Sequence, residues 1–167
     1  RNYPASLTKM MTLYILFDYI NKGKLTEKTP LYVSSVAASR SPSKLYLEIG
    51  STIKVKDAIL ALIIKSANDV ATVVAEHISG TERDFAKLMN KYAKNLGMRQ
   101  TTFKNASGLP NRAQMTTARD IATLSHALIK NFPDQYKLFS QKKFTWNGKT
   151  YKTHNKLMLN YSGADGI

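Results

Sequence analysis

The feature that most constrains this chain is an apolar run from Met10 to Ile20. Nine of its eleven residues are aliphatic, aromatic or methionine, so a helix through it has almost no polar face, which is typical of a helix buried on most sides. Pro4 suits the run-in or first position of such a helix, because its missing N–H would have no intrahelical partner there. We therefore expect a central helix that begins within residues 3–11 and continues to about Ile20.

Ser6 and Lys9 fall in the first turn of this expected helix, three residues apart and on one face. Burial disfavours the charged form of a lysine, so Lys9 could accept the proton of Ser6 as that hydroxyl attacks a carbonyl. The free backbone N–H groups of a first turn point the same way, and the resulting oxyanion would meet the N–H of Ser6. These two residues are the candidate nucleophile and base.

The spacing alone does not identify a site, because Ser-x-x-Lys occurs four times in the chain. The other three pairs are Ser41 with Lys44, Ser51 with Lys54, and Ser140 with Lys143. They fall in an expected loop, in a strand-like run and just before an expected hairpin, whereas only Ser6 opens a buried helix. The alternative is that Ser6 is an ordinary serine at a helix N-terminus.

The composition excludes several classes of site. The 167 residues include no cysteine and only three scattered histidines, which rules out disulfides and thiolate metal sites and gives no metal-ligand spacing. We therefore expect neither a metal nor a cofactor. No apolar stretch is long enough to span a bilayer, and no signal peptide is recognisable.

The charge is strongly positive and unevenly distributed. Of the net +14, residues 1–84 carry 11 basic and 8 acidic groups, while residues 85–167 carry 14 basic and 3 acidic groups. An excess of this kind favours anionic partners. Nucleic acid is not expected, because the lysines are dispersed and 19 Lys against 6 Arg is the reverse of what bidentate phosphate recognition prefers. A non-catalytic cationic module for cell-wall or membrane surfaces is one alternative function.

The remaining patterns predict one domain of the α+β class, without a linker or an internal repeat. Helices are expected from Asp57 to Lys65, from Asp69 to Ile78, and after two capping boxes at Thr81–Asp84 and Thr117–Asp120. A hairpin is expected over Phe144–Tyr151, with Asn-Gly at its tip. A small β element around a Gly-Ser turn is expected over residues 45–55.

Ser66-Ala67-Asn68, the only Ser-x-Asn in the chain, follows Ser6 by 60 residues and lies between two apolar helices. Further motifs occur in order, namely Tyr3-Pro4-Ala5-Ser6-Leu7-Thr8-Lys9-Met10-Met11-Thr12, Ser66-Ala67-Asn68-Asp69-Val70-Ala71, Leu96-Gly97-Met98, Asn105-Ala106-Ser107-Gly108-Leu109 and Thr117-Ala118-Arg119-Asp120. Together they resemble the low-molecular-mass penicillin-binding proteins, the serine D-alanyl-D-alanine carboxypeptidases of peptidase family S11. The resemblance covers nearly the whole chain.

The resemblance implies a role for each matched residue. Ser6 would attack the carbonyl between the last two D-alanines of a peptidoglycan stem peptide and form an acyl-enzyme, with Lys9 as its base. Ser66 would relay a proton toward the leaving amine, and Asn68 would bind the substrate's peptide backbone and help to hold Lys9. The alternatives are that Ser66 caps the next helix and that Asn68 forms a local turn.

The resemblance also implies the fold and the partners. The expected fold is β-lactamase/transpeptidase-like, with residues 1–167 as a partial catalytic domain that supplies mainly helices, short strands and one hairpin. The family's third motif, Lys-Thr-Gly on a sheet strand, is absent, so we expect a domain cut at both ends that lacks most of the antiparallel sheet and is weakly active or inactive. β-Lactams would acylate Ser6.

The location that follows from the resemblance is the periplasm or the outer face of the cytoplasmic membrane, with any membrane attachment through a region outside this chain. The enzyme alternative is a serine β-lactamase. The class A type needs a deacylating glutamate in a Glu-x-x-x-Asn loop, and no such pentapeptide occurs here.

Overall fold

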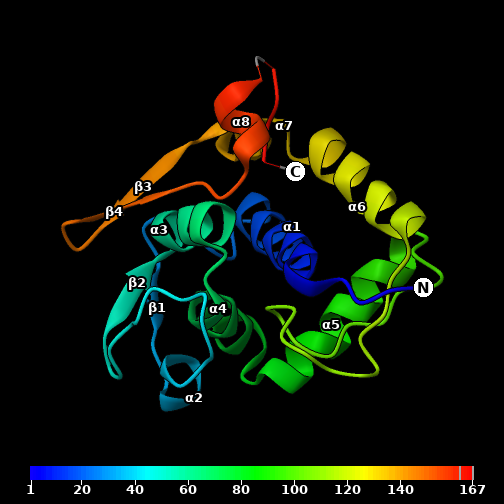
Figure 1. Ribbon diagram of the computed structural model, residues 1–167. Coiled ribbons are helices and arrows are strands. Elements are labelled where there is room, and N and C mark those ends of the chain that lie inside the picture. The colour runs from blue at the N-terminus through cyan, green and yellow to red at the C-terminus, as the bar shows by residue number, and fades with distance from the viewer. Residues whose placement is uncertain (162, 167) are drawn as a thin grey trace.

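The computed structural model describes residues 1–161 and 163–166 of the chain. In the body of the molecule, helices pack around one central helix, and a two-stranded hairpin projects from this body (Figure 1). The elements are η1 (Ala5–Leu7), α1 (Thr8–Asn21), β1 (Pro30–Tyr32), α2 (Ser35–Ala38), β2 (Thr52–Lys54), α3 (Val55–Leu60), η2 (Ala61–Lys65), α4 (Asn68–Ser79), α5 (Glu82–Asn95), α6 (Ala118–Asn131), α7 (Pro133–Tyr136), η3 (Lys137–Ser140), β3 (Lys143–Trp146), β4 (Lys149–Lys152) and α8 (Lys156–Asn160).

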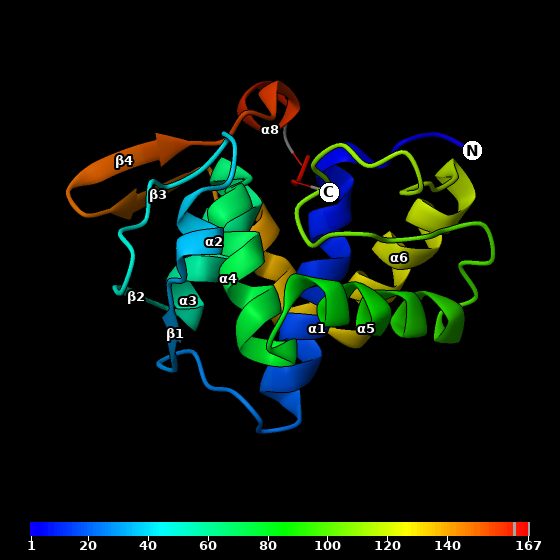
Figure 2. The same cartoon turned by 90° about the horizontal axis from the view of Figure 1, so that it is seen from below.

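Helix α1 is the centre of the fold, as its apolar run predicts. Every residue from Thr8 to Phe17 is buried, and α4, α5 and α6 pack against the helix (Figures 1 and 2). The N-terminal turn differs from the expectation. Residues 5–7 form a single 3₁₀ turn, and the α-helix begins only at Thr8, so Ser6 lies just before the long helix rather than inside it.

The strands form two small antiparallel sheets. Strand β1 pairs with β2, with Leu31 opposite Ile53, and β3 pairs with β4. The expected β element over residues 45–55 is only partly correct, because β2 covers its last part alone. The physical reason is Asp69, whose carboxylate accepts hydrogen bonds from the backbone N–H groups of Leu45 and Leu47 and so replaces a partner strand.

Both expected capping boxes supply N-terminal caps. The hydroxyl of Thr81 accepts from the Asp84 N–H at 3.1 Å and begins α5, and the hydroxyl of Thr117 accepts from the Asp120 N–H at 3.2 Å and begins α6. Asp120 is buried and also accepts from the backbone N–H of Gln100 at 2.9 Å. Its carboxylate therefore links the start of α6 to the turn that follows α5.

The helix expected over residues 57–65 begins earlier and changes its winding. Helix α3 begins at Val55, and residues 61–65 form the π-helical turn η2. Ser66 then takes a left-handed backbone conformation, with φ 55° and ψ 43°. π-Turns of this kind occur frequently at functional sites.

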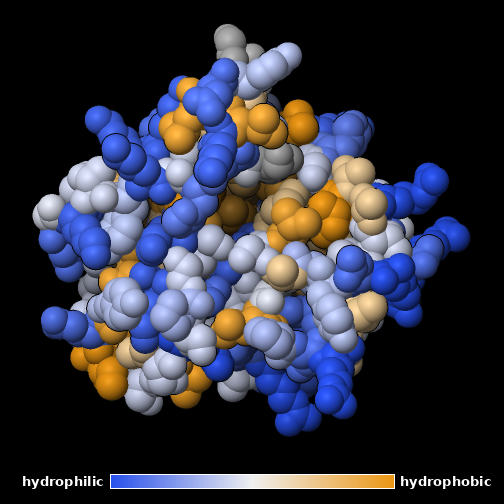
Figure 3. All heavy atoms as spheres, viewed as in Figure 1, coloured by the Kyte–Doolittle hydropathy of each residue, from blue (hydrophilic) through white to orange (hydrophobic). Residues whose placement is uncertain are grey.

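The surface combines charged and apolar areas. Exposed apolar side chains include Leu7, Ile129 on α6, and Leu157 and Leu159 on α8, and Figure 3 shows apolar atoms gathered on the face that carries α8. Among the described helices, none combines the length and the apolar character that crossing a membrane requires.

Candidate active site

Ser6 lies on an exposed and conformationally unusual turn at the N-terminal end of α1. Ala5, directly before it, has a positive φ of 47°, which is rare for a residue with a side chain. Within residues 1–161 and 163–166, neither the hydroxyl nor the backbone N–H of Ser6 has a hydrogen-bond partner. Both groups are therefore free to meet a substrate carbonyl, the hydroxyl as nucleophile and the N–H as oxyanion donor.

Lys9 lies one turn after Ser6 and is buried, with a relative exposure of 3%. Its Nζ donates a hydrogen bond to the carbonyl oxygen of Ser107 at 2.5 Å. Burial lowers the pKa of Lys9 from 10.5 to about 8, because the low-dielectric interior disfavours the ammonium form. A base with a pKa close to neutrality suits proton transfer at physiological pH.

The segment that holds Lys9 also contacts α1 and the turn before it. Thr12 donates to the carbonyl of Ala106 at 2.7 Å, and Gly108 packs against the backbone of Ala5 in η1. A Cβ on Gly108 would lie 1.8 Å from the Ala5 carbonyl oxygen, and its φ of +89° also favours glycine. The loop over residues 105–108 therefore positions both the candidate base and the turn that carries the candidate nucleophile.

Ser66 shares a cavity with Ser6 and Lys9. The cavity has a volume of about 470 Å³ and is lined by Pro4, Ala5, Ser6, Leu7, Lys9, Met10, Leu13, Leu62, Ile63, Ser66, Phe139 and Gly166. The alternative role of Ser66 as a helix cap is wrong, since α4 has Ala67 at its N-cap position and no side-chain cap. The left-handed backbone of Ser66 instead follows the π-turn that borders the cavity.

Asn68 is placed differently from the other three residues. It does not line this cavity. Its Nδ2 donates to the Ser41 carbonyl at 2.9 Å, and its backbone N–H donates to the Ser43 carbonyl at 2.7 Å. No hydrogen bond between Asn68 and Lys9 supports the expected holding of Lys9 among the described residues, where the Lys9 Nζ donates to the Ser107 carbonyl. Asn68 therefore holds the loop over residues 41–43, close to the local role considered as its alternative.

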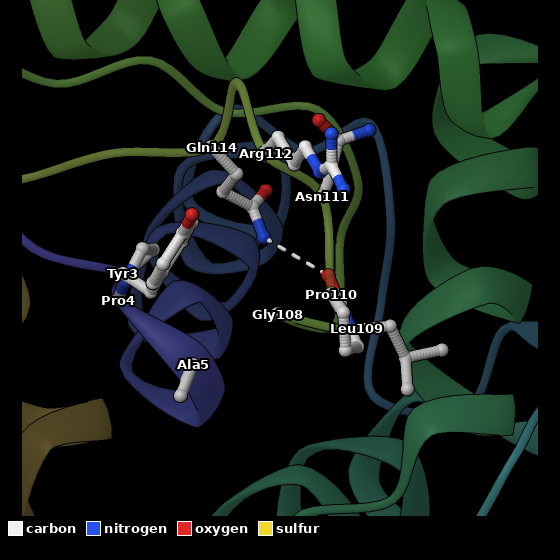
Figure 4. A pocket seen from close by; sticks show the side chains of 9 residues that line it. All are labelled: Tyr3, Pro4, Ala5, Gly108, Leu109, Pro110, Asn111, Arg112 and Gln114. Carbon is white, nitrogen blue, oxygen red and sulfur yellow. Dashed lines mark hydrogen bonds between the residues drawn. The ribbon is translucent and has the colours of Figure 1, made fainter.

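A second, more apolar pocket also borders Pro4 and Ala5 (Figure 4). It has a volume of about 300 Å³ and is lined by Tyr3, Pro4, Ala5, Gly108, Leu109, Pro110, Asn111, Arg112 and Gln114. Gln114 is buried, and its Nε2 donates to the Leu109 carbonyl at 3.4 Å. The 3₁₀ turn thus borders two hollows, and only the larger one contains Ser6 and Lys9.

Two further observations concern the surroundings of the site. Lys65, the residue directly before Ser66, is only partly exposed, and its Nζ lies 5.4 Å from the centre of the Tyr151 ring. No group of three or more His, Cys, Asp or Glu side chains is placed to hold a metal ion within the described part of the chain.

Ser6, the desolvated Lys9 and Ser66 thus lie around one cavity. Comparison with known protein families identifies a serine-enzyme family that fits this arrangement. The family model for D-alanyl-D-alanine carboxypeptidases of peptidase family S11 matches residues 1–167. The chain belongs to this family. The resemblance carried by the sequence motifs is therefore confirmed, and the β-lactamase alternative is not favoured.

Curated S11 relatives match along the whole chain but extend well beyond it. DacA of Haemophilus influenzae is 35% identical over 171 residues, covering 100% of this chain and 44% of the relative. DacC of Escherichia coli is 37% identical over 171 residues, covering 98% and 43%. This S11 chain therefore spans less than half the length of these two relatives.

Solved S11-type structures confirm the expected fold class. Penicillin-binding protein 5 from Haemophilus influenzae superposes with a TM-score of 0.90 at 34% identity, covering 95% of this chain and 47% of that one. Penicillin-binding protein D2 from Listeria monocytogenes, solved in its ampicillin-bound form, gives 0.85 at 32% identity, covering 98% and 67%. This chain has the helix-rich part of the β-lactamase/transpeptidase-like fold.

Proposed function

We propose that this chain forms part of a serine D-alanyl-D-alanine carboxypeptidase that acts on peptidoglycan stem peptides through an acyl-enzyme on Ser6. The observation that carries the proposal is the shared cavity, in which the Ser6 hydroxyl has no hydrogen-bond partner among the described residues and lies one turn before Lys9, a lysine with a lowered pKa. Family membership supports the substrate class. The proposed location is outside the cytoplasmic membrane, where peptidoglycan is found.

The proposed reaction moves one proton at each step. The Ser6 Oγ attacks the carbonyl carbon between the last two D-alanines, and its proton passes to the Lys9 Nζ. The oxyanion accepts a hydrogen bond from the Ser6 N–H. The C–N bond then breaks, and the leaving amine of D-alanine takes a proton relayed from Lys9 through Ser66. Water hydrolyses the ester, which returns the proton to Ser6 and releases the shortened peptide.

Two further parts of the proposed reaction lie outside this cavity. Asn68 would bind the substrate's peptide backbone through its Oδ1 or its second amide proton, since one Nδ2 proton is donated to the Ser41 carbonyl. The second oxyanion donor of the family belongs to the Lys-Thr-Gly strand, which these 167 residues do not contain. We therefore propose that the isolated chain acylates slowly.

Labelling with a fluorescent penicillin tests the nucleophile. β-Lactams resemble the D-alanyl-D-alanine terminus, and the cleaved ring stays tethered and blocks water, so Ser6 is expected to become covalently labelled. Ser6→Ala should abolish the label, whereas Ser140→Ala, the matched change in another Ser-x-x-Lys pair, should retain it. Mass spectrometry of the labelled peptide identifies the site.

Two results would contradict the proposal. Label on a residue other than Ser6, or equal labelling of the Ser6→Ala variant, would remove Ser6 as nucleophile. Labelling of the isolated chain as fast as that of a full-length S11 relative would refute its weak activity. Rapid release of the penicilloyl group, rather than a stable adduct, would indicate a β-lactamase.

A further inference from the structure

The outward face of the hairpin carries an unusual pair of lysines. In the register of β3 and β4, Lys143 lies directly opposite Lys152, and Thr145 lies opposite Thr150. All four side chains are exposed, and the two threonine hydroxyls are 2.9 Å apart. Two ammonium groups and two hydroxyls therefore share one side of a narrow two-stranded ribbon.

Nothing in the described part of the chain neutralises this face. Like charges directly opposite each other destabilise a sheet, yet neither lysine forms an ion pair with a described residue. Residues 135–164 contain six lysines and no aspartate or glutamate. Three of these six lysines, Lys143, Lys149 and Lys152, lie on the hairpin strands, which project from the helical body (Figure 1).

The opposite face of the hairpin places this charge beside the active-site cavity. Phe144 is buried in the core, and β3 and β4 both contact η2. The Tyr151 ring lies 5.4 Å from the Nζ of Lys65, the residue directly before Ser66. A polymer bound to the outward face would therefore be held close to the cavity that contains Ser6.

The composition of the hairpin favours an anionic polymer over a lipid bilayer. The tip residues are Asn147 and Gly148, and the neighbouring Trp146 is only partly exposed, so the hairpin presents no exposed apolar tip to insert between lipids. The segment after Arg119 contains no arginine, so this face binds anions through the point charges of lysine rather than through bidentate forks, which suit carboxylate and phosphate alike. Among anionic polymers, the peptidoglycan of the proposed function carries separate carboxylates, each of which a single ammonium group can bind.

We propose that the outward face of the hairpin, formed by Lys143, Thr145, Thr150 and Lys152, binds the free carboxylates of the peptidoglycan polymer and holds the polymer beside the Ser6 cavity. The choice of polymer rests on the proposed function, whereas the anionic character of the ligand rests on the hairpin itself. Such tethering raises the local concentration of stem peptides at the cavity. The interaction weakens as salt screens the exposed charges.

Co-sedimentation with purified peptidoglycan tests this binding face. The double variant Lys143→Gln/Lys152→Gln is compared with the matched pair Lys91→Gln/Lys94→Gln, which removes two exposed lysines from α5 on the far side of the body (Figure 1). Both are made in a Ser6→Ala background, so that binding is measured without acylation. We expect roughly three- to tenfold weaker binding at low ionic strength for the hairpin variant only, the loss being smaller at high ionic strength.

The ligand is varied as well as the protein. Peptidoglycan whose carboxylates have been converted to neutral amides should bind the unaltered hairpin as weakly as native peptidoglycan binds the hairpin variant. Equal loss in the α5 pair would show an effect of net charge and overturn the proposal, as would full binding to the amidated polymer. Tighter, hairpin-dependent binding to polyphosphate or to phosphatidylglycerol vesicles would identify a different occupant and also overturn it.

The binding test and the penicillin label fail independently. Hairpin-dependent sedimentation without labelling of Ser6 would retain the binding face and remove the proposed reaction. Labelling of Ser6 with unchanged sedimentation of the hairpin variant would retain the reaction and remove the binding face.

Discussion

The helical body and the hairpin use lysine in opposite ways. In the body, Lys9 is buried and donates a hydrogen bond to the Ser107 carbonyl. Its burial lowers its pKa to about 8. In the hairpin, Lys143 and Lys152 are exposed and directly opposite each other. Because water stabilises an ammonium group and the protein interior does not, the first environment makes a proton acceptor and the second retains fixed positive charge.

The 19 lysines of this chain therefore differ in their properties according to their surroundings. Among them, Lys9 is the one that we propose to take part in the reaction. Measurements at the buried lysine and at exposed lysines test this difference, and the largest effect is expected at Lys9.

Replacement of the buried lysine should have the largest effect on chemistry. Lys9→Met removes the proposed base for the Ser6 proton, so the rate of acylation by penicillin should fall by about a hundredfold or more. Lys91→Met, the same change at an exposed lysine of α5, should leave the rate unchanged. Stopped-flow or gel-based measurement of the acylation rate provides the comparison.

The pH dependence of that rate gives an independent check. Because the neutral amine is the active form, acylation should increase as pH rises through about 8 and then level off. A rate in the unaltered chain that does not change with pH between 6 and about 9 would mean that Lys9 is not the titrating base.

The stability of the fold should also depend on Lys9, by a smaller amount. Between pH 8 and 10.5 the unfolded chain holds the Lys9 proton and the folded chain has lost it, so the free energy of unfolding rises with pH in that window. Relative to Lys9→Met, the unaltered chain should gain about 3 kcal/mol across it. Denaturant unfolding at several pH values measures this gain, and a constant difference between the two proteins would contradict it.

The smallest expected effect lies in the hairpin. Lys143→Gln should raise the free energy of unfolding by a few tenths of a kcal/mol at low salt, because it removes one member of a like-charge pair. Lys152→Gln should give the same gain, and the double variant little more, since both changes relieve one repulsion. Additive gains, or gains that persist at high salt, would show that the two lysines do not repel each other.

The sequence predicts those elements whose signals are local. The apolar run after Pro4 predicts α1, the two Thr-x-x-Asp boxes predict the starts of α5 and α6, and Asn147-Gly148 predicts the β3–β4 turn. In each case a few neighbouring residues determine the backbone, so no knowledge of tertiary contacts is required. The pairing of Ser6 with Lys9 has the same local character.

The rest depends on contacts between distant segments. The acceptor for Lys9 is a backbone carbonyl 98 residues away, and backbone groups leave no sequence signal. Asp69 diverts residues 45–47 from the expected strand, and Ser41 takes the amide of Asn68. The motif Asn105-Ala106-Ser107-Gly108-Leu109 was recognised by resemblance, but its support of the base became evident only from the structure.

The π-turn η2 has a consequence for the tolerance of this chain to length changes. An α-helical turn advances about 100° per residue, so loss of one residue within Ala61–Lys65 would rewind the turn and swing Ser66 away from the cavity by roughly that angle. Every side chain with a proposed catalytic role would still be present. The chain therefore depends on the number of residues in this stretch as well as on their identity, and a single-codon deletion there would be more damaging than most substitutions.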